Sequence, residues 1–492
     1  MKHKPNILLL FTDQQRFDTI RALGNTVIKT PNLDRLVREG TAFTSAYTPS
    51  PVCVSARCSM HFGQYPHHTG CYENNFKMPH DGRPTFMQLL TESGYRTHGV
   101  GKCHFYPDED SLYGFQTRAT QEEFSSDWRK DDYMRTLRQD EGLDHIIDPH
   151  GMRGEMYYMP QLAQMPARLH PTQWIGDQSV SFLNEQKESD QPWMLFSSFI
   201  HPHPPFVPPA PWHKLYRAPQ MPLPFVPPEW ESLLMHVNHH QNRYKYRDRG
   251  IDQNLERCMK AFYYACISFV DFQVGRIFQT LEETGQLDNT LVVMTSDHGE
   301  LLGDYNSFGK RSMHDAAMRI PLLARWPGAF KAGAQCNHVA SLVDLFPTFT
   351  AAAGIDTGGL QLDGENLLDV ANGKSDRSMV ISQMNCAENG VYAGITEQYK
   401  LAFSAPDQRE WFFDRTADPQ ESRNHINDKA QRNALAETRR QLMDILRSGE
   451  EAATLDGDSW KTYPVKTVPA DPDANLITQD QAWSNAHIDG YS

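Results

Sequence analysis

Short apolar runs that end abruptly in polar residues constrain the fold of this chain more than any other feature. Residues 7–11 form a continuous apolar run, and residues 193–199 and 290–296 are further runs of strand length. Strands that are buried on both faces show this pattern, which is typical of parallel sheets. In open sheets of this kind, functional residues gather at the carboxyl ends of the strands.

Segments with helical periodicity lie between these runs. They are Pro31–Glu39, Phe86–Ser93 and Asn254–Gly285. Strands that alternate with helices predict a sheet with helices on both faces. We therefore predict an α/β fold, with a large mixed but mostly parallel sheet flanked by helices.

The pattern changes after about residue 375. We expect two short antiparallel strands and an amphipathic helix, at Tyr399–Phe403, Glu410–Phe413 and Ala430–Ser448. A chain of 492 residues also exceeds what one hydrophobic core usually supports. We therefore predict a large α/β domain at residues 1–375 and a smaller α+β subdomain at residues 376–492, which ends in an extended tail.

Two segments have an unusual composition. Residues 201–228 carry eleven of the 32 prolines, which predicts a stiff, extended surface segment. The tail after residue 450 is polar but contains four aromatic residues, Trp460, Tyr463, Trp483 and Tyr491. We expect this tail to pack on the body of the protein or on a neighbouring subunit, which would make a homo-oligomer.

The net charge of −14 argues against nucleic acid and anionic membranes as partners. No apolar stretch approaches the ~20 residues of a membrane span. The apolar run near the N-terminus is too short for a signal peptide, which indicates a cytoplasmic protein. Because the net charge is negative, any anionic substrate needs a strongly positive local pocket.

Eight cysteines occur without a C-x-x-C pair, so zinc-finger and thioredoxin-like sites lack support. Most of them should be free, buried thiols, and Cys258 and Cys266 lie in a helical stretch as packing residues. Cys53 differs because Arg57 follows it four positions later. A fixed guanidinium and a helix N-terminus beside the sulfur would favour an anion. A cysteine phosphatase loop is excluded, because it requires arginine where Ser59 stands, but a structural cysteine stays possible.

Polar pairs follow two of the predicted strands. Asp13-Gln14 and Asp297-His298 offer three oxygen donors and one imidazole. Hard oxygen donors suit calcium, magnesium or manganese, whereas the histidine leaves a transition metal possible. Either pair alone could be an ordinary turn or helix cap, but the two together favour a metal site.

Further cationic and titratable residues occur in short motifs. Lys102 and His104 alternate, so they project the same way if the segment is extended. His201 and His203 stand between prolines, and Lys310 follows a glycine. Each could be an ordinary surface residue, but a lysine supplies a positive charge and a histidine an acid or a base.

The motifs TDQQ, PVCVSARCSMHFGQYPHHTG, GYRTHGVGKCHF, HPHPPF and TSDHGELLGDYNSFGK occur in this order. In this order the chain resembles the type I sulfatase family over nearly its whole length. The resemblance implies a fold similar to alkaline phosphatase and hydrolysis of a sulfate ester. The stretch EWFFD with Asp418-Pro419 resembles the small antiparallel subdomain of this family.

The resemblance also implies a role for each matching residue. Cys53 matches the cysteine that a maturation enzyme oxidises to formylglycine, and Arg57 matches the residue that steadies its hydrate. The matching metal ligands, usually for calcium, are Asp13, Gln14, Asp297 and His298. Lys102 and Lys310 match two lysines that bind sulfate oxygens. His104 matches a base, and His203 matches the acid that protonates the leaving group. Asn74 matches a polar residue near the metal.

Some positions depart from the family pattern. Ser55 stands where the maturation signature usually has proline or alanine, which makes oxidation of Cys53 conditional on the maturation enzyme. Phosphonate monoester hydrolases and phosphodiesterases are related alternatives, but they tend to lack the Lys102 and His104 pair. A protein that only binds sulfated ligands is a third alternative, if Cys53 stays a thiol.

The leaving group is less constrained by the sequence. Residues 109–172 and the proline-rich segment should form the walls of the pocket. Polar and aromatic residues of these segments and their edges could bind a sulfated sugar, either a small molecule or an oligosaccharide, and include Arg153, His170, Trp174, His201 and Trp212. Packing is the alternative role for each, and we expect a carbohydrate sulfate.

Overall fold

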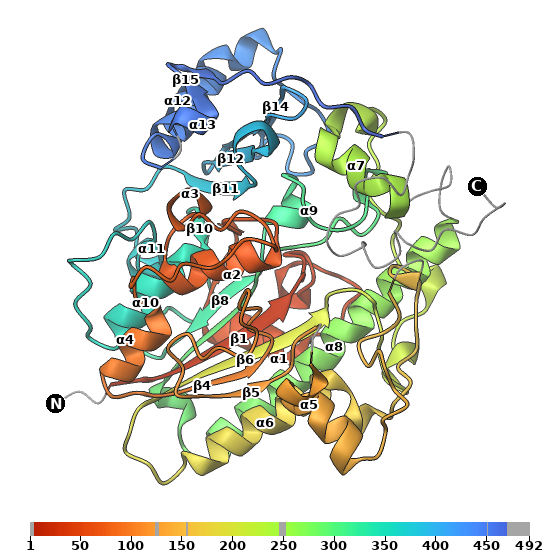
Figure 1. The fold of residues 1–492 in the computed structure, drawn as a ribbon, viewed down its shortest axis with the longest axis vertical. Coiled ribbons are helices and arrows are strands. Elements are labelled where there is room, and N and C mark those ends of the chain that lie inside the picture. Colours follow the sequence, from red (N-terminus) through yellow and green to blue (C-terminus); the bar gives the residue numbers. More distant parts are fainter. Residues whose placement is uncertain (1–3, 124–126, 154–155, 246–251, 450, 470–492) are drawn as a thin grey trace.

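The computed structural model describes residues 4–123, 127–153, 156–245, 252–449 and 451–469. An eight-stranded sheet forms the centre of the molecule (Figure 1). In spatial order its strands are β5 (Thr117–Thr120), β4 (Arg96–Gly101), β6 (Trp193–Pro202), β1 (Asn6–Asp13), β7 (Thr290–Ser296), β8 (Leu322–Arg325), β2 (Thr41–Phe43) and β9 (Ala334–Cys336). Only β8 runs antiparallel to its neighbours within this sheet, so the predicted mixed, mostly parallel sheet is confirmed.

Helices cover both faces of the sheet because successive side chains of a strand point to opposite faces. Leu9 and Phe11 of β1 pack with one group of helices, α2 (Cys53–Phe62), α4 (Phe86–Glu92) and α10 (Leu345–Ala352). Leu8 and Leu10 pack with the opposite group, α1 (Pro31–Glu39), α6 (Pro171–Glu185) and α8 (Gln253–Glu283). The two groups lie on opposite sides of the sheet in Figure 1. A strand buried on both faces therefore explains the continuous apolar run of β1.

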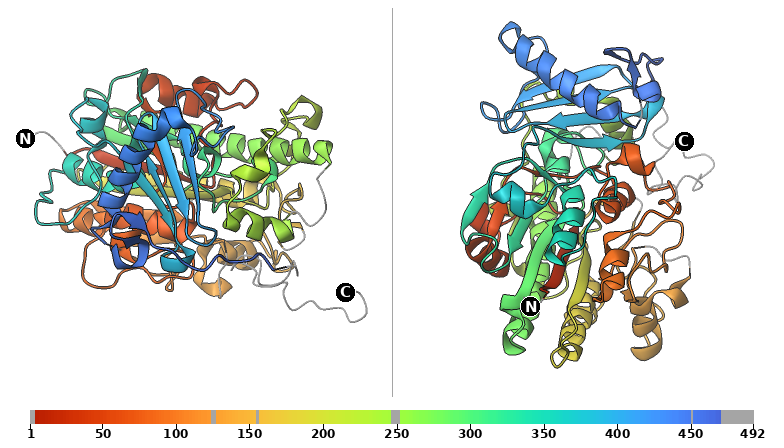
Figure 2. Two further views of the ribbon diagram at one scale, coloured as in Figure 1. Left: turned by 90° about the horizontal axis from the view of Figure 1, so that it is seen from above. Right: turned by 90° about the vertical axis from the view of Figure 1, so that its left-hand side faces the viewer.

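A four-stranded antiparallel sheet lies at the far end of the molecule (Figure 2). It consists of β11 (Val380–Met384), β12 (Val391–Ile395), β13 (Tyr399–Ser404) and β14 (Arg409–Asp414). Helix α12 (Arg432–Leu446) packs on it through Leu435, Leu442 and Leu446. The predicted strands and helix of this region are confirmed, and the boundary near residue 375 stays a prediction.

Part of the C-terminal tail packs on this sheet. The Trp460 ring stacks on Phe403 with a centroid distance of 4.3 Å, and its Nε1 donates to Glu410. The Tyr463 hydroxyl donates to the Ala453 carbonyl. Trp483 and Tyr491 lie outside the described residues, so the expected oligomer contact through the tail stays a prediction.

The proline-rich segment is not a surface segment along its whole length. Strand β6 continues through Pro202, and residues 201–209 are buried. Pro202 stands at the very end of the strand, where the register with β1 shifts at Asp13. A terminal position accommodates a residue without an N–H group, which the prediction from composition overlooked.

The remaining short elements connect these layers. They are β3 (Ala46–Tyr47), α3 (Pro66–Thr69), α5 (Asp132–Arg135), α7 (His236–Lys245), α9 (Asp315–Met318), β10 (Ala340–Ser341), α11 (Leu367–Ala371), α13 (Glu451–Thr454), β15 (Leu455–Asp456) and β16 (Ser459–Trp460). The eight cysteines are free, and five of them are buried. Among the described helices, none combines the length and the apolar character that a membrane span requires.

Candidate active site

The two predicted metal-binding pairs meet because their strands are neighbours. Strands β1 and β7 are parallel and in register, with Thr12 opposite Ser296, so both end at the same edge of the sheet. The backbone N–H of Gln14 donates to the Asp297 carboxylate over 3.0 Å. Ligand atoms of Asp13, Cys53, Asp297 and His298 all lie within 4.8 Å of one another. The sheet therefore assembles one buried site from segments almost 300 residues apart.

The other contacts of His298 and Gln14 leave one potential ligand atom of each side chain free to face the candidate metal site. His298 Nδ1 lies 3.0 Å from the Gly299 carbonyl, which leaves Nε2 facing the site. Burial lowers the pKa of His298 to about 4, so its imidazole is neutral at pH 7 and has a lone pair for a metal. The Gln14 amide nitrogen donates to Glu300, and its Oε1 is buried without a hydrogen-bond partner. An orphaned buried oxygen beside two carboxylates and an imidazole fits a divalent cation.

Cys53 is the first residue of α2 and is fully buried. Its Sγ lies 3.2 Å from His298 Nε2 and 2.6 Å from Lys310 Nζ. Asn74 accepts a hydrogen bond from the N–H of the following residue, Val54, over 3.1 Å. Burial raises the pKa of the Cys53 thiol to about 12, despite the lysines nearby. The bare cysteine is therefore a poor nucleophile at neutral pH, because attack requires the thiolate.

Arg57 holds the two carboxylates of the candidate metal site in place. Its Nε donates to Asp297 over 3.0 Å, and its Nη2 donates to Asp13 over 3.1 Å. Its Nη1 donates to the Lys102 carbonyl and to Ser198 Oγ. The guanidinium is fully buried, and every contact described here fixes the site rather than the Cys53 side chain. The suggested role in steadying residue 53 itself stays a prediction.

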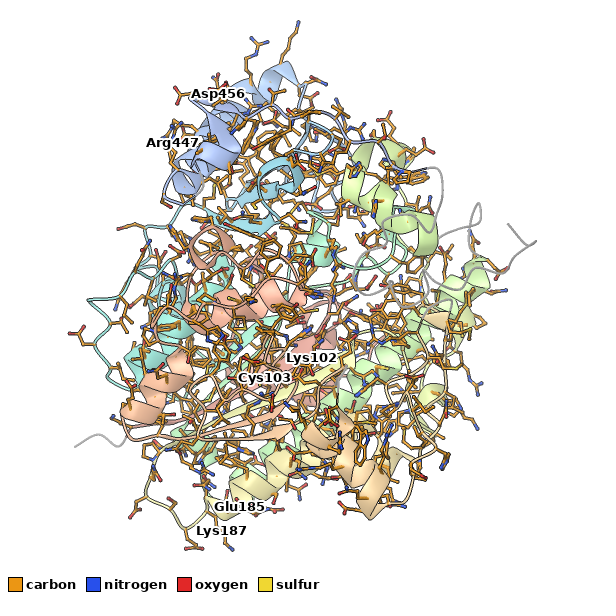
Figure 3. All side chains as sticks on the ribbon, in the orientation of Figure 1. Lys102, Cys103, Glu185, Lys187, Arg447 and Asp456 are labelled. Carbon is orange, nitrogen blue, oxygen red and sulfur yellow. The ribbon has the colours of Figure 1, made fainter. Side chains whose placement is uncertain are left out.

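Glu123 joins the cationic groups of the site, and the sequence did not single it out. Lys102 Nζ lies 2.7 Å from Asp13 and 2.6 Å from Glu123. Glu123 also contacts Arg153, and it lies 3.2 Å from His203 Nδ1. The only available signal was its position just after β5, whose carboxyl end lies at the same sheet edge. Figure 3 shows Lys102 in the interior of the molecule, whereas Arg447 lies at the end of helix α12 in the C-terminal part.

Lys310 and His203 complete the part of the site that faces Cys53. Lys310 Nζ lies 3.2 Å from His203 Nε2, and both side chains are almost fully buried. Burial lowers the pKa of His203 well below its usual range, while Glu123 acts in the opposite direction. His203 presents Nε2 toward the lysine, whereas its Nδ1 lies 2.6 Å from the Pro204 carbonyl oxygen and 3.2 Å from the Glu123 carboxylate.

His104 does not project as an extended segment would predict. Its backbone has a φ of 56°, in the left-handed region, and its N–H donates to the Glu122 carboxylate. This turn, rather than strand alternation, places the ring near Lys102. Burial, followed by Lys102, lowers the pKa of His104 well below its usual range, so its ring is neutral. Its Nδ1 is buried without a hydrogen-bond partner among the described residues.

The residues predicted to bind substrate do not all line the same cavity. Arg153 lines a cavity of about 260 Å³ next to the site, together with Glu123, Trp128 and His150. His170 lies behind it as the N-cap of α6, where its ring nitrogens contact the Val207 carbonyl and the Thr172 N–H. These contacts favour a structural role for His170.

His201 and two tryptophans also lie outside the cavity wall. The ring of His201 packs 5.0 Å from that of His170, and its Nδ1 lies 3.1 Å from Thr172 Oγ1. Trp174 belongs to the hydrophobic core, and Trp212 packs on Phe269. The tryptophan that does line the cavity is Trp128, which the sequence did not indicate.

This fold and this site define a class, the metal-dependent hydrolases of anionic esters that share the alkaline phosphatase-like fold. Within that class the chain belongs to the sulfatase family, because the Sulfatase family model matches residues 5–355. A second family model, described as N-sulphoglucosamine sulphohydrolase, C-terminal, matches residues 303–448. The chain is therefore a sulfuric ester hydrolase.

Individual relatives agree with this assignment. An arylsulfatase of Clostridium perfringens is 29% identical, and the match covers 94% of this chain and 99% of the relative. The structure of a phosphonate monoester hydrolase from Silicibacter pomeroyi has a TM-score of 0.77 at 23% identity, covering 93% of this chain and 99% of that one. A third structure, solved in complex with its substrate D-glucosamine-2-N,6-O-disulfate, has a TM-score of 0.67 at 22% identity, covering 90% and 97%. The two structural likenesses show the fold alone.

Proposed function

We propose that the protein hydrolyses the sulfate monoester of a carbohydrate, with Cys53 oxidised to formylglycine and a calcium ion held by Asp13, Gln14, Asp297 and His298. The observation that carries this proposal is the convergence of Lys310, His298 and the metal-ligand carboxylates on the buried Cys53 Sγ. The thiol marks the position from which an oxygen nucleophile would attack. Calcium is favoured because three of the four ligands are oxygens, although magnesium and manganese share this preference.

A bound metal ion and the formylglycine formed from Cys53 would each supply part of the chemistry. A divalent cation provides a positive charge that draws electron density from the sulfate oxygens, and formylglycine provides, as its hydrate, the attacking oxygen. The side chains do the remaining work. Lys310 and Lys102 place two ammonium groups beside the nucleophile position, where they would bind sulfate oxygens and neutralise the negative charge that repels an incoming anion.

His203 is the candidate acid for the leaving group. Its Nε2 lies beside the Lys310 ammonium, so it is next to the position of a bound sulfate, while the Pro204 carbonyl and the Glu123 carboxylate both face the opposite nitrogen. A proton on Nε2 could pass to the oxygen of the departing alcohol. His104 is the candidate base for the second half of the reaction, since its neutral ring has a free Nδ1 near Lys102.

Oxidation of Cys53 requires access that the folded protein does not give. Cys53 is fully buried, and Ser55 is also buried and donates to the Cys71 carbonyl. A maturation enzyme would therefore have to act on the chain before it folds. If this step fails, the protein would be limited to binding sulfated ligands.

The sulfate ester is favoured over a phosphonate ester by the Lys102 and His104 pair, both of which lie at the site. A carbohydrate leaving group is favoured by the cavity beside Glu123. Trp128 offers a face for a sugar ring, and Arg138 and Arg153 offer hydrogen-bond donors for hydroxyl groups or for a second sulfate.

The decisive experiment combines detection of the aldehyde with a substrate panel. The aldehyde at position 53 is about 18 Da lighter than cysteine, but its hydrate is not, so labelling with an aminooxy probe should accompany the intact mass. We expect labelled peptide at Cys53 and turnover of sulfated sugars in proportion to the labelled fraction. Turnover of phosphonate monoesters at a higher kcat/KM than every sulfate ester would overturn the sulfate assignment.

A further inference from the structure

A second group of metal-ligating side chains lies apart from the active site, where the large α/β unit meets the C-terminal subdomain. It consists of His67 and His68 of the short helix α3 and Asp363, in the connection between α10 and α11. One ligand atom from each lies within 4.8 Å of the others. We propose that these three residues bind a transition-metal ion such as Zn²⁺, at a site that the proposed catalytic reaction does not use.

The carboxylate of this site is already held in position. Asp363 Oδ2 accepts a hydrogen bond from the Tyr65 N–H over 2.7 Å, and its own N–H donates to the Gly63 carbonyl. Its two oxygens lie 2.8 and 3.0 Å from His68 Nδ1. A metal ion would replace the proton between this nitrogen and the carboxylate.

The two imidazoles present suitable nitrogens to the same point. Their ring centroids are 4.1 Å apart, and the Nδ1 of His67 is buried without a hydrogen-bond partner in the described structure. Ser448 Oγ lies 3.0 Å from His68 Nε2 and 3.4 Å from His67 Nε2. One hydroxyl thus contacts the outer nitrogen of both rings and leaves each Nδ1 for the ion, as partners of metal-bound histidines do.

The ligand set selects a different metal from that of the active site. Two imidazoles and one carboxylate are a set that zinc takes, with a fourth position filled by water or a hydroxyl group. The active site instead offers three oxygens and one imidazole, which suits calcium. The two sites should therefore be distinguishable by the ions that they retain.

A metal here would fasten two parts of the molecule together. His67 and Asp363 belong to the large α/β unit, whereas Ser448 and Gly449 follow α12 of the C-terminal subdomain. The contact is close, because a Cβ atom added at Gly449 would lie 2.6 Å from the His67 carbonyl oxygen. An ion that fixes the two imidazoles should therefore stabilise the folded protein, since it binds the folded state alone.

The test compares zinc content in the full-length protein and two variants. The variant His68→Asn removes a ligand, and His425→Asn is the matched control, because His425 forms a similar pair with Asp428 over 2.7 Å but belongs to no group of three metal-ligating side chains within the described residues. After dialysis against Zn²⁺ and gel filtration, we expect the wild type and the control to retain one zinc per chain more than His68→Asn. Zinc at the active site is common to all three proteins and cancels.

A thermal measurement supplies the second readout. Saturating Zn²⁺ should raise the Tm of the wild type and of His425→Asn by ~3 °C or more beyond the shift, common to all three proteins, that zinc at the active site produces in His68→Asn. If His68→Asn does not fold, His67→Gln removes the other imidazole and gives the same comparison. Equal zinc content in the wild type and the ligand variants, or an equal shift of Tm, would overturn the proposal.

Discussion

Two buried clusters of charged residues in this molecule look alike in composition but differ in what they can do. The active-site cluster contains Asp13, Cys53, Arg57, Lys102 and Lys310. The junction cluster, between α9 and the antiparallel sheet, contains Tyr47, Asp315, Lys400, Arg415 and Glu421. Both place lysine and carboxylate side chains in the protein interior, where an unpaired charge is costly.

The charged groups of the junction cluster pair with one another. Lys400 Nζ lies 2.8 Å from Asp315 and also contacts Glu421, while the Tyr47 hydroxyl donates to Asp315. Although burial opposes ionisation, Lys400 holds the pKa of Asp315 below its usual range. Charges of opposite sign face one another in this cluster, which makes it a structural connection, although Arg415 Nε has no hydrogen-bond partner among the described residues.

The active site also contains buried polar atoms without a hydrogen-bond partner in the described structure. Gln14 Oε1 and His104 Nδ1 are buried without partners, and His298 and His203 point nitrogens toward the Cys53 side chain and Lys310. Burial and charge are thus common to both clusters, and the active-site cluster differs because its carboxylates, imidazole and lysine gather around one side chain, Cys53. The following changes test that difference.

The largest effect should come from Cys53→Ala. This change removes the only group of the active-site cluster that could become the nucleophile, so we expect kcat to fall by ~10⁴-fold or more. The cavity is small, so the Tm should change little. Cys58→Ala is the control, because Cys58 is an equally buried thiol on the same helix and should keep its activity. Activity of the Cys53 variant above one part in about a hundred would contradict the assignment.

We expect the reverse for Lys400→Met in the junction cluster, a loss of stability with no change of kcat. The substitution keeps the volume but leaves Asp315 and Glu421 buried without their cation, which should cost about 3–5 kcal/mol of unfolding free energy. Chemical denaturation measures this loss, and kcat of the folded fraction should be unchanged. Lys374→Met, at an exposed ion pair with Asp369, should alter stability by less than about 0.5 kcal/mol. An equally small effect at Lys400 would mean that the junction cluster does not stabilise the fold.

His203→Gln should have an intermediate effect that depends on the substrate. Esters with poor leaving groups need a proton from the enzyme, so their kcat/KM should fall by ~10²-fold or more, whereas activated aryl sulfates should lose much less. A series of sulfate esters with different leaving-group pKa values measures this dependence. His201→Gln provides the comparison, since His201 lies two residues away but contacts Thr172 instead of the site. A uniform loss across the series would argue against His203 as the acid.

The sequence was informative where one pattern determined both fold and chemistry. The apolar runs of β1 and β7 predict strands of one mostly parallel sheet, whose carboxyl ends carry the functional residues, and for this reason Asp13 and Asp297 could be assigned to one site without a structure. Glu123 and Glu300 were missed because their roles depend on contacts between loops that no local pattern encodes. The left-handed backbone of His104 was missed for a similar reason, since it brings the predicted residue to the site by a turn rather than by strand alternation.

The smallest predicted effect comes from Glu123→Gln, and it tests whether the active-site cluster tunes an acid. The His203 acid must be protonated in the free enzyme, so kcat/KM falls as the pH rises through its pKa. Burial lowers this pKa and the Glu123 carboxylate raises it. Removal of the carboxylate should therefore move the descending limb to lower pH and reduce kcat/KM at pH 8 by about tenfold.

The control for this change is Asp148→Asn, a carboxylate of the same cavity that makes no described contact with His203. It should leave the pH profile in place. Because Glu123 also contacts Lys102 and Arg153, its substitution could instead alter only substrate affinity. In that case KM would change while the descending limb stayed at the wild-type pH, and Glu123 would be a partner of the sulfate-binding cations rather than of the acid.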